Sequence, residues 1–158
     1  MAAVAEDRHP RPGDLAPDFT LPDTHGTPVH LGGHRGRPVL LVFYPFAFSG
    51  TCTHELAGLR DNLEAFDTAG ATLLGISCDS VFAQKAWDEQ QGFGFDLLSD
   101  FWPHGEVARS YGVLDERRGL AVRGSFLVDA DGVVRWSVVN PPGRARDLDS
   151  YRRALAQL

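Results

Sequence analysis

The sequence is poor in cysteine, and this scarcity excludes several kinds of protein. Its 158 residues contain two cysteines, Cys52 and Cys78, which are too few for the disulfide framework of a small secreted domain. It has no Cys-x-x-Cys pair and no His-Glu-x-x-His sequence, and its six histidines are not spaced as zinc ligands are. We therefore expect a protein from a reducing compartment that binds no metal.

Long apolar runs and an excess of basic charge are also absent. No apolar stretch approaches the roughly 18–20 residues that span a bilayer, and residues 1–12 lack the apolar core of a signal peptide. The formal net charge of -6 argues against a nucleic-acid partner, since proteins that bind nucleic acid are usually basic. These features predict a cytoplasmic protein that binds neither membranes nor nucleic acid.

The length and composition that remain favour one globular domain. A chain of 158 residues, 43% hydrophobic and 23% charged, is large enough to bury a well-formed core. We predict that residues 1–12, with their alanine, proline and charged side chains, form a disordered tail. Residues 13–158 are predicted to form a single domain.

Hydrophobic patterns predict a strand–helix–strand unit in the middle of the chain. The continuous apolar run 39–43 is typical of a strand that is buried on both faces. An apolar stripe with spacings of three and four residues predicts one helix from Cys52 to Gly70. Residues 71–77 are the next apolar strand, so we expect two parallel strands joined by a right-handed crossover.

The other patterns predict the rest of an α/β fold. The N-terminal part, 18–31, has two short strand patterns around turn residues and predicts a β-hairpin. Further helices are expected over 79–91, 103–111 and 147–158, and further strands over 95–98, 124–128 and 133–139. This order is that of a thioredoxin-like fold: a central mixed β-sheet flanked by helices, with an N-terminal β-hairpin extension. The basic, glycine-rich segment 32–38 lacks the Lys-Ser/Thr ending of a phosphate loop and is expected to be a solvated connection.

Cys52 stands where a reactive thiol is expected. The apolar run stops at Pro45, a small polar turn follows, and Cys52 is at the start of the next helical pattern. Free N–H groups at a helix N-terminus stabilise an anion, so a cysteine in that position is favoured as a nucleophilic thiolate. The alternative is an inert core cysteine. Cys52 follows a loop and not a core strand, which favours the nucleophile.

The spacing around Cys52 is specific. The pattern Pro-x-x-x-Thr/Ser-x-x-Cys-x-x-Glu is matched by Pro45, Ser49, Cys52 and Glu55. It resembles the active-site signature of the peroxiredoxins, and the resemblance extends over nearly the whole chain through segments 16–19, 98–105 and 123–126. The run 98–105 resembles the AhpE-like one-cysteine branch of that family. The resemblance implies a thiol-dependent peroxidase that needs no bound cofactor.

The expected reaction uses Cys52 as the redox centre. Its thiolate attacks hydrogen peroxide, an organic hydroperoxide or peroxynitrite and becomes a sulfenic acid. The Ser49 hydroxyl and the main-chain N–H groups of Thr51 and Cys52 can stabilise the negative charge of the transition state. Arg123 matches the active-site arginine of the family and is expected to supply the positive charge. The alternative for Arg123 is an ordinary surface arginine.

Pro45 and Glu55 are expected to support the site. The resemblance implies that Pro45 shields the sulfur and shapes the loop, although a proline can also simply end a strand. Glu55 is expected to bridge to an arginine and hold the loop, or else to be a favourable charge at a helix N-terminus.

Cys78 decides between two mechanisms. It ends the second central strand, which is not a usual place for a resolving cysteine of this family. We therefore expect a one-cysteine enzyme reduced by an external thiol, either a low-molecular-weight thiol with a glutaredoxin-like protein or thioredoxin. Parallel strands bring both cysteines toward one edge of the sheet, so topology alone leaves a Cys52–Cys78 disulfide open. The family also implies a homodimer or a larger homo-oligomer.

Two other functions remain open on the sequence. One is a redox sensor or chaperone that is switched by oxidation of Cys52. The other is a thioredoxin-fold thiol-disulfide oxidoreductase, against which the missing Cys-x-x-Cys pair counts. Steady consumption of peroxide with excess thiol separates an enzyme from a sensor.

Overall fold

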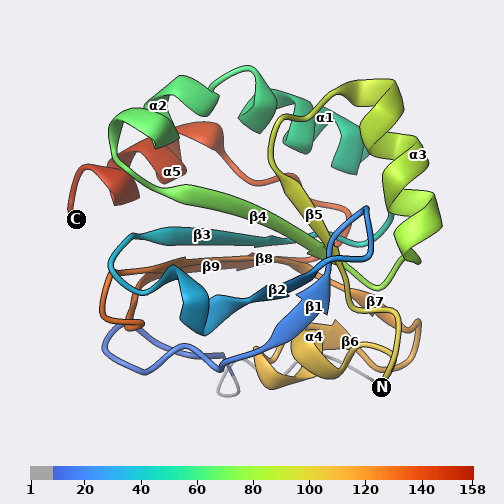
Figure 1. Ribbon diagram of the computed structural model, residues 1–158, viewed down its shortest axis with the longest axis horizontal. Helices are drawn as coiled ribbons and strands as arrows, with labels where there is room; N and C mark the ends of the chain where they lie inside the picture. The colour runs from blue at the N-terminus through green and yellow to red at the C-terminus, as the bar shows by residue number, and fades with distance from the viewer. Residues whose placement is uncertain (1–8) are drawn as a thin grey trace.

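The structure, a computed structural model, describes residues 9–158 and is built around a five-stranded sheet of order β5-β4-β3-β8-β9 (Figure 1). The strands are β3 (Val39–Phe43), β4 (Thr72–Ser77), β5 (Asp96–Ser99), β8 (Arg123–Val128) and β9 (Val134–Asn140). β3, β4 and β5 are parallel, β8 is antiparallel to β3, and β9 is antiparallel to β8. The predicted mixed sheet and the predicted parallel strand–helix–strand unit are confirmed.

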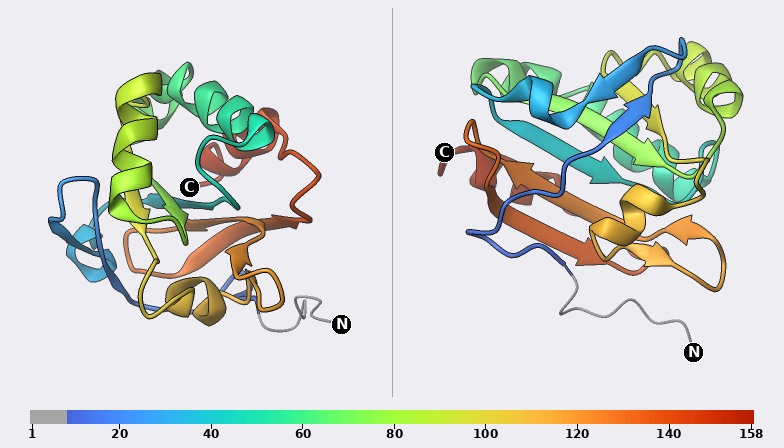
Figure 2. Two further views of the ribbon diagram at one scale, coloured as in Figure 1. Left: turned by 90° about the vertical axis from the view of Figure 1, so that its right-hand side faces the viewer. Right: turned by 60° about the horizontal axis from the view of Figure 1, so that its bottom comes forward.

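The two faces of the sheet are covered differently (Figures 1 and 2). One face packs against α1 (Gly50–Arg60), α2 (Leu63–Thr68), α3 (Val81–Gln91) and α5 (Leu148–Leu155). The other packs against α4 (Glu106–Ser110), the hairpin of β1 (Thr20–Pro22) and β2 (Pro28–His30), the 3-10 helix η2 (Leu31–His34), and a small hairpin of β6 (Leu114–Asp115) and β7 (Leu120–Ala121). This is the predicted thioredoxin-like arrangement with its N-terminal β-hairpin.

Both faces of β3 are buried, which explains why its sequence is apolar throughout. Leu41 and Phe43 belong to the hydrophobic cluster on the α4 side, and Leu40 and Val42 belong to the cluster beneath α1 and α3. Successive side chains of a strand point to opposite faces. A strand covered on both faces therefore needs apolar residues at every position, as the sequence of β3 has.

The helix expected from Cys52 to Gly70 is two helices. α1 ends at Arg60, and α2 begins at Leu63. The side-chain amide of Asn62 donates a hydrogen bond of 2.8 Å to the carbonyl oxygen of Gly58. The Gly58 carbonyl oxygen would accept from a main-chain N–H if the helix continued. Hydrogen bonds from side chains to such carbonyls compete with continuation of the helix. The apolar stripe continues across the break, so the spacing pattern alone did not reveal it.

Two further differences involve short elements. The helix expected over 103–111 is only one turn and a half, because residues before it form turns and its N-cap, Gly105, has φ of 70°. The hairpin of β6 and β7 was not predicted, since each strand has two residues and shows no alternation. The helix expected over 79–91 is α3, and its N-cap is Ser80, whose Oγ accepts from the Ala83 N–H at 3.2 Å.

Most of the predicted tail, residues 1–8, lies outside the described residues. Within the remainder, Pro10 is buried, and the Arg11 N–H donates to the Asp14 carboxylate at 2.7 Å. The boundary at residue 12 therefore stays a prediction. Among residues 9–158, no helix has both the length and the apolar composition needed to cross a membrane.

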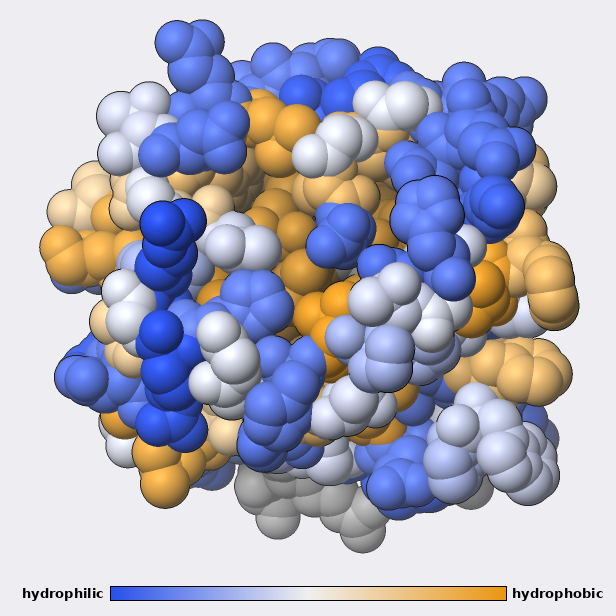
Figure 3. Space-filling view, viewed as in Figure 1, coloured by the Kyte–Doolittle hydropathy of each residue, from blue (hydrophilic) through white to orange (hydrophobic). Residues whose placement is uncertain are grey.

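The face shown in Figure 3 is mostly hydrophilic around a central hollow with a hydrophobic floor. A pocket of about 320 Å³ lies between α2 and the beginnings of β4 and β5, with Leu63, Phe66 and Phe95 in its lining. Cys52, in contrast, follows the end of β3, which is parallel to β4. The pocket is thus at the opposite end of the sheet from the cysteine.

Candidate active site

The loop of residues 45–49, called here the β3–α1 loop, connects the buried strand β3 to the helix that carries Cys52. Ser49 is the N-cap of α1, and its Oγ accepts a hydrogen bond from the Cys52 N–H at 3.3 Å. Cys52 lies in the first turn of the helix and is fully buried. The N–H of Cys52 is thus already bonded, whereas the Ser49 hydroxyl keeps its own proton to donate.

Arg123 contacts the sulfur of Cys52. It is the first residue of β8, and its Nη1 donates to the Cys52 Sγ at 3.3 Å. Arg123 is 2% exposed, and its Nε donates to the Pro142 carbonyl oxygen at 2.6 Å, which fixes the direction of the guanidinium. A permanent cation held against the sulfur stabilises negative charge that develops there.

Glu55 connects two buried arginines. Its Oε1 accepts from Arg123 Nη1 and from Arg146 Nη2, and its Oε2 accepts from the main-chain N–H and Nε of Arg146 at 2.6 and 3.0 Å. Burial alone would raise the pKa of the Glu55 carboxyl, but the hydrogen bonds and charge of Arg146 and the charge of Arg123 lower that pKa below its usual value. Glu55 is therefore ionised at neutral pH and bridges to arginine, as expected from its position.

Arg146 was not singled out by the sequence. It precedes α5, and its side chain is 1% exposed. Its Nη1 donates to the carbonyl oxygens of Phe43 and Gly124 and to the Ser125 Oγ, at 2.7, 2.9 and 3.0 Å. Arg146 thus joins the segment before α5 to β3 and β8. Other arginines lie close to Arg146 in the sequence, and no local pattern distinguishes it from them. The one indirect signal for its role was the expectation that Glu55 pairs with an arginine.

The structure therefore brings four of the five predicted site residues together: Cys52, Ser49, Arg123 and Glu55. The fifth, Pro45, is buried at the beginning of the same loop. Its shielding of the sulfur stays a prediction.

Cys78 lies on the other side of the sheet from Cys52. Cys52 packs in the hydrophobic cluster beneath α1 and α3, and Cys78 packs with Phe43 and Ile76 in the cluster on the α4 side. Both cysteines are free thiols. Burial, together with the charges of Asp100 and Asp79, raises the pKa of the Cys78 thiol to about 12. Cys78 is consequently protonated and unreactive at neutral pH.

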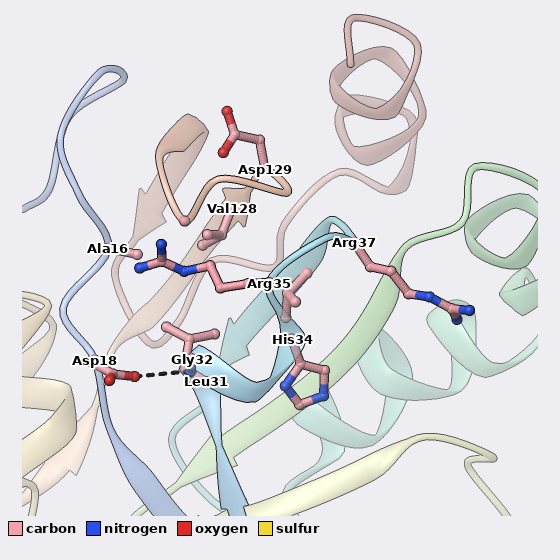
Figure 4. A pocket seen from close by; sticks show the side chains of 11 residues that line it. Ala16, Asp18, Leu31, Gly32, His34, Arg35, Arg37, Val128 and Asp129 are labelled. Atoms are coloured by element: carbon pink, nitrogen blue, oxygen red, sulfur yellow. Dashed lines mark hydrogen bonds between the residues drawn. The ribbon is translucent and has the colours of Figure 1, made fainter.

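The basic segment 32–38 shows no anion site. It borders a cavity of about 10 Å³ at the end of the sheet where β3 begins, and Figure 4 shows Arg35 extended beside this cavity. The Asp18 carboxylate accepts from the Gly32 N–H at 3.0 Å, and Asp129 also borders the cavity. Two carboxylates in so small a space disfavour an anion. Residues 9–158 also contain no cluster of three or more His, Cys, Asp or Glu side chains arranged to hold a metal.

Comparison with known proteins gives one consistent result. The model of the AhpC/TSA family matches residues 12–137. Over 147 residues the chain is 48% identical to alkyl hydroperoxide reductase E of Mycobacterium tuberculosis, spanning 92% of this chain and 96% of that protein. Over 152 residues it is 38% identical to peroxiredoxin 2 of Thermoplasma acidophilum, spanning 92% and 75% of the two chains.

A solved structure agrees with these sequence relatives. The crystal structure of peroxidoxin BcpB from Mycobacterium tuberculosis superposes with a TM-score of 0.85 at 34% identity, covering 95% of this chain and 99% of the other. The sequence match, the similar fold and the buried cysteine beside an arginine point the same way. The chain belongs to the AhpC/TSA family, the peroxiredoxins.

Proposed function

We propose that the protein is a thiol-dependent peroxidase whose redox centre is Cys52. The observation that carries the proposal is the 3.3 Å contact between the Arg123 guanidinium and the Cys52 sulfur at the N-terminus of α1. The names of its relatives, alkyl hydroperoxide reductase and peroxiredoxin, support a peroxide as the substrate. Hydrogen peroxide, organic hydroperoxides and peroxynitrite are the candidate substrates, and antioxidant defence is the expected role.

The reaction breaks one O–O bond and forms one S–O bond. The Cys52 thiolate gives an electron pair to the terminal peroxide oxygen, and the other oxygen leaves with the electron pair of the O–O bond. The leaving oxygen takes a proton and departs as water or an alcohol, while Cys52 becomes a sulfenic acid. Arg123, the Ser49 hydroxyl and the Thr51 N–H, which is unpaired within the helix, stabilise the charge on sulfur and oxygen in the transition state.

Glu55 and Pro45 have supporting roles in this proposal. Glu55 holds Arg123 against the sulfur through its bonds to both arginines. Pro45 keeps the loop in place and limits the access of water to the sulfur.

Replacing Cys52 by Ser tests the function. We expect peroxide consumption with excess dithiothreitol to fall to the background rate, because an alcohol is a far weaker nucleophile than a thiolate at neutral pH. Many turnovers per wild-type molecule would favour an enzyme, whereas one equivalent of peroxide followed by a halt would favour a redox sensor or chaperone. Undiminished turnover by Cys52→Ser would overturn the assignment.

We propose that the sulfenic acid is reduced by an external thiol, so the enzyme uses one cysteine. The support is that the two thiols pack on opposite faces of the sheet. The reductant is a low-molecular-weight thiol with a glutaredoxin-like protein, or thioredoxin. The low number of cysteines supports a reducing compartment and hence the cytoplasm.

We propose that the protein forms a homodimer, or a larger homo-oligomer, through the edge of the sheet beside Cys52. Five large aromatic residues that follow β3, β4 or β5 are between 50% and 84% exposed: Phe46, Phe48, Phe82, Phe101 and Trp102. Exposed apolar patches on soluble proteins mark contact surfaces. Sedimentation velocity of the reduced protein measures the assembly.

A further inference from the structure

The β3–α1 loop is held from one side by the segment that follows β4. The Ala47 N–H donates to the Asp79 Oδ2 at 2.7 Å, a bond between residues 32 positions apart. The ring of Phe48 lies 6.3 Å from that of Trp87 on α3, centroid to centroid. Both contacts fall in the three residues that lie between Pro45 and Ser49. The loop therefore depends on residues outside the known signature for its position.

The backbone of this loop is strained. Among residues 9–158, Phe48 is the one non-glycine residue with a positive φ, at 70°. Such a conformation costs a non-glycine residue roughly 1–2 kcal/mol and persists only where its surroundings enforce it. Phe48 is 53% exposed, so burial of its side chain supplies only part of that enforcement. A bond to the preceding residue, Ala47, is well placed to supply the rest.

The carboxylate that accepts this bond is itself fixed in place. The Ser77 Oγ donates to the same Asp79 Oδ2 at 2.7 Å. The buried Gln84 side chain of α3 donates to the Ser77 Oγ at 2.9 Å, and the Ser99 Oγ donates to the Asp79 main-chain carbonyl at 2.6 Å. The ends of β4 and β5 and the first turn of α3 thus all fix Asp79. A hydrogen bond to a rigid charged acceptor is stronger than a bond to a mobile neutral one.

We infer that Asp79 is a positioning residue for the peroxidase reaction, acting on Cys52 through the main chain of the β3–α1 loop. Asp79 holds Ala47, Ala47 sets the strained turn at Phe48, and that turn places Ser49, whose Oγ is bonded to the Cys52 N–H. The inference rests on the proposed peroxidase function. Because Cys52 is fully buried, a thiol reductant, which is bulkier than hydrogen peroxide, needs a larger movement of this loop to reach the sulfur than the peroxide needs. Asp79 therefore favours attack on peroxide and opposes attack by the reductant.

The two half-reactions test this role separately. Asp79→Ala is expected to slow oxidation of Cys52 by hydrogen peroxide about tenfold, the effect of losing one charge-assisted hydrogen bond, and to speed reaction of the sulfenic acid with dithiothreitol. Asp79→Asn keeps an acceptor oxygen for Ala47, so its oxidation rate should lie nearer to that of the wild type. Asp67→Ala, an exposed aspartate of α2, is the matched control and should leave both rates unchanged. Stopped-flow tryptophan fluorescence gives both rate constants.

The outcomes are distinguishable from simple loss of structure. A partly unfolded variant would react with a smaller amplitude at an unchanged rate constant, and this result would overturn the inference, as would a wild-type rate for Asp79→Ala. If Asp79→Ala does not fold by circular dichroism, Ser77→Ala, which removes the hydroxyl that fixes the carboxylate, must show the same opposite changes in the two half-reactions. Absence of peroxide reaction in the wild type would instead contradict the proposed function itself.

Discussion

At the scale of single residues, the buried side chains beside Cys52 carry more positive than negative charge. Arg123 and Arg146 contribute two positive charges, and Glu55 contributes one negative charge. All three side chains are at most 5% exposed, so solvent compensates little of the excess positive charge. In the proposed reaction, negative charge on the sulfur and on the peroxide oxygens develops beside this excess of positive charge, next to the Arg123 guanidinium.

Replacing Arg123 by Ala should slow the oxidation of Cys52 by peroxide about a hundredfold, the usual cost of removing one donor from a site that stabilises a transition state. The Arg123 guanidinium is the cation that touches the sulfur, whereas Arg146 acts through Glu55. Stopped-flow fluorescence at a series of peroxide concentrations gives the second-order rate constant. Arg109→Ala, on an exposed arginine paired with Glu116, is the control. Equal rates for Arg123→Ala and the control would make Arg123 a structural residue.

At the scale of elements, the short helix α4 depends on a side chain from outside the helix. α4 has five residues, and its N-cap, Gly105, has no side chain to accept from the first N–H groups. The Asp100 carboxylate, just after β5, accepts instead from the N–H groups of Val107 and Ala108 at 3.2 and 2.8 Å. Burial raises the pKa of Asp100 to about 6, although these two bonds act to lower it.

The raised pKa of Asp100 gives stability a definite pH dependence. Between its unfolded pKa, about 4, and its folded pKa, about 6, the folded state holds a proton that the unfolded state has lost. The contribution of Asp100 to the free energy of unfolding is therefore fully present below pH ~4 and is lost as the pH rises through ~6. The loss lowers the free energy of unfolding by up to about 3 kcal/mol. Asp100→Asn cannot titrate and should lack this component.

Urea unfolding of the wild type and Asp100→Asn at pH 4.5 and pH 7 measures the effect. The difference between the two unfolding free energies at each pH cancels the contributions of the titratable groups that both proteins share. The wild type should be less stable relative to the variant at pH 7 than at pH 4.5. An identical difference at both pH values would show that Asp100 does not titrate in this range. Glu55 acts in the opposite direction, since its lowered pKa gives stability that is lost only as the solution becomes strongly acidic.

At the scale of the whole molecule, the sheet itself separates the two thiols. Cys52 and Cys78 both follow strands that end at the same edge, but their side chains pack against opposite faces. A disulfide requires Cα atoms within about 7 Å and Cβ atoms that point toward each other. The packing of the two thiols in opposite hydrophobic clusters opposes the second condition. The alternative left open by topology is thus disfavoured by packing.

One equivalent of peroxide should therefore leave a sulfenic acid on Cys52 that dimedone traps, and excess peroxide should oxidise it further to sulfinic acid. Cys78→Ser should keep the wild-type turnover with dithiothreitol, because Cys78 is a protonated, buried thiol. Intact mass and non-reducing peptide mapping identify the products. A stoichiometric Cys52–Cys78 bond, with turnover lost in Cys78→Ser, would replace this mechanism with a two-cysteine one.

The sequence by itself determined the local parts of this protein. The apolar run of β3 and the start of a helix beside Cys52 each depend on interactions within a few residues, and such interactions leave a readable pattern. The fold class followed because the order of strands and helices allows few topologies.

Only the tertiary structure decided what surrounds the sulfur. Arg123 reaches Cys52 across 71 positions and Arg146 reaches Glu55 across 91, and no local spacing marks contacts between residues so far apart. For Arg123 the resemblance to a family supplied the missing information. For Arg146 the one signal was the arginine partner expected for Glu55, and that expectation did not say which arginine it would be. The face on which Cys78 packs was equally hidden, because the side of a strand covered by a given helix depends on how the whole chain closes around the sheet.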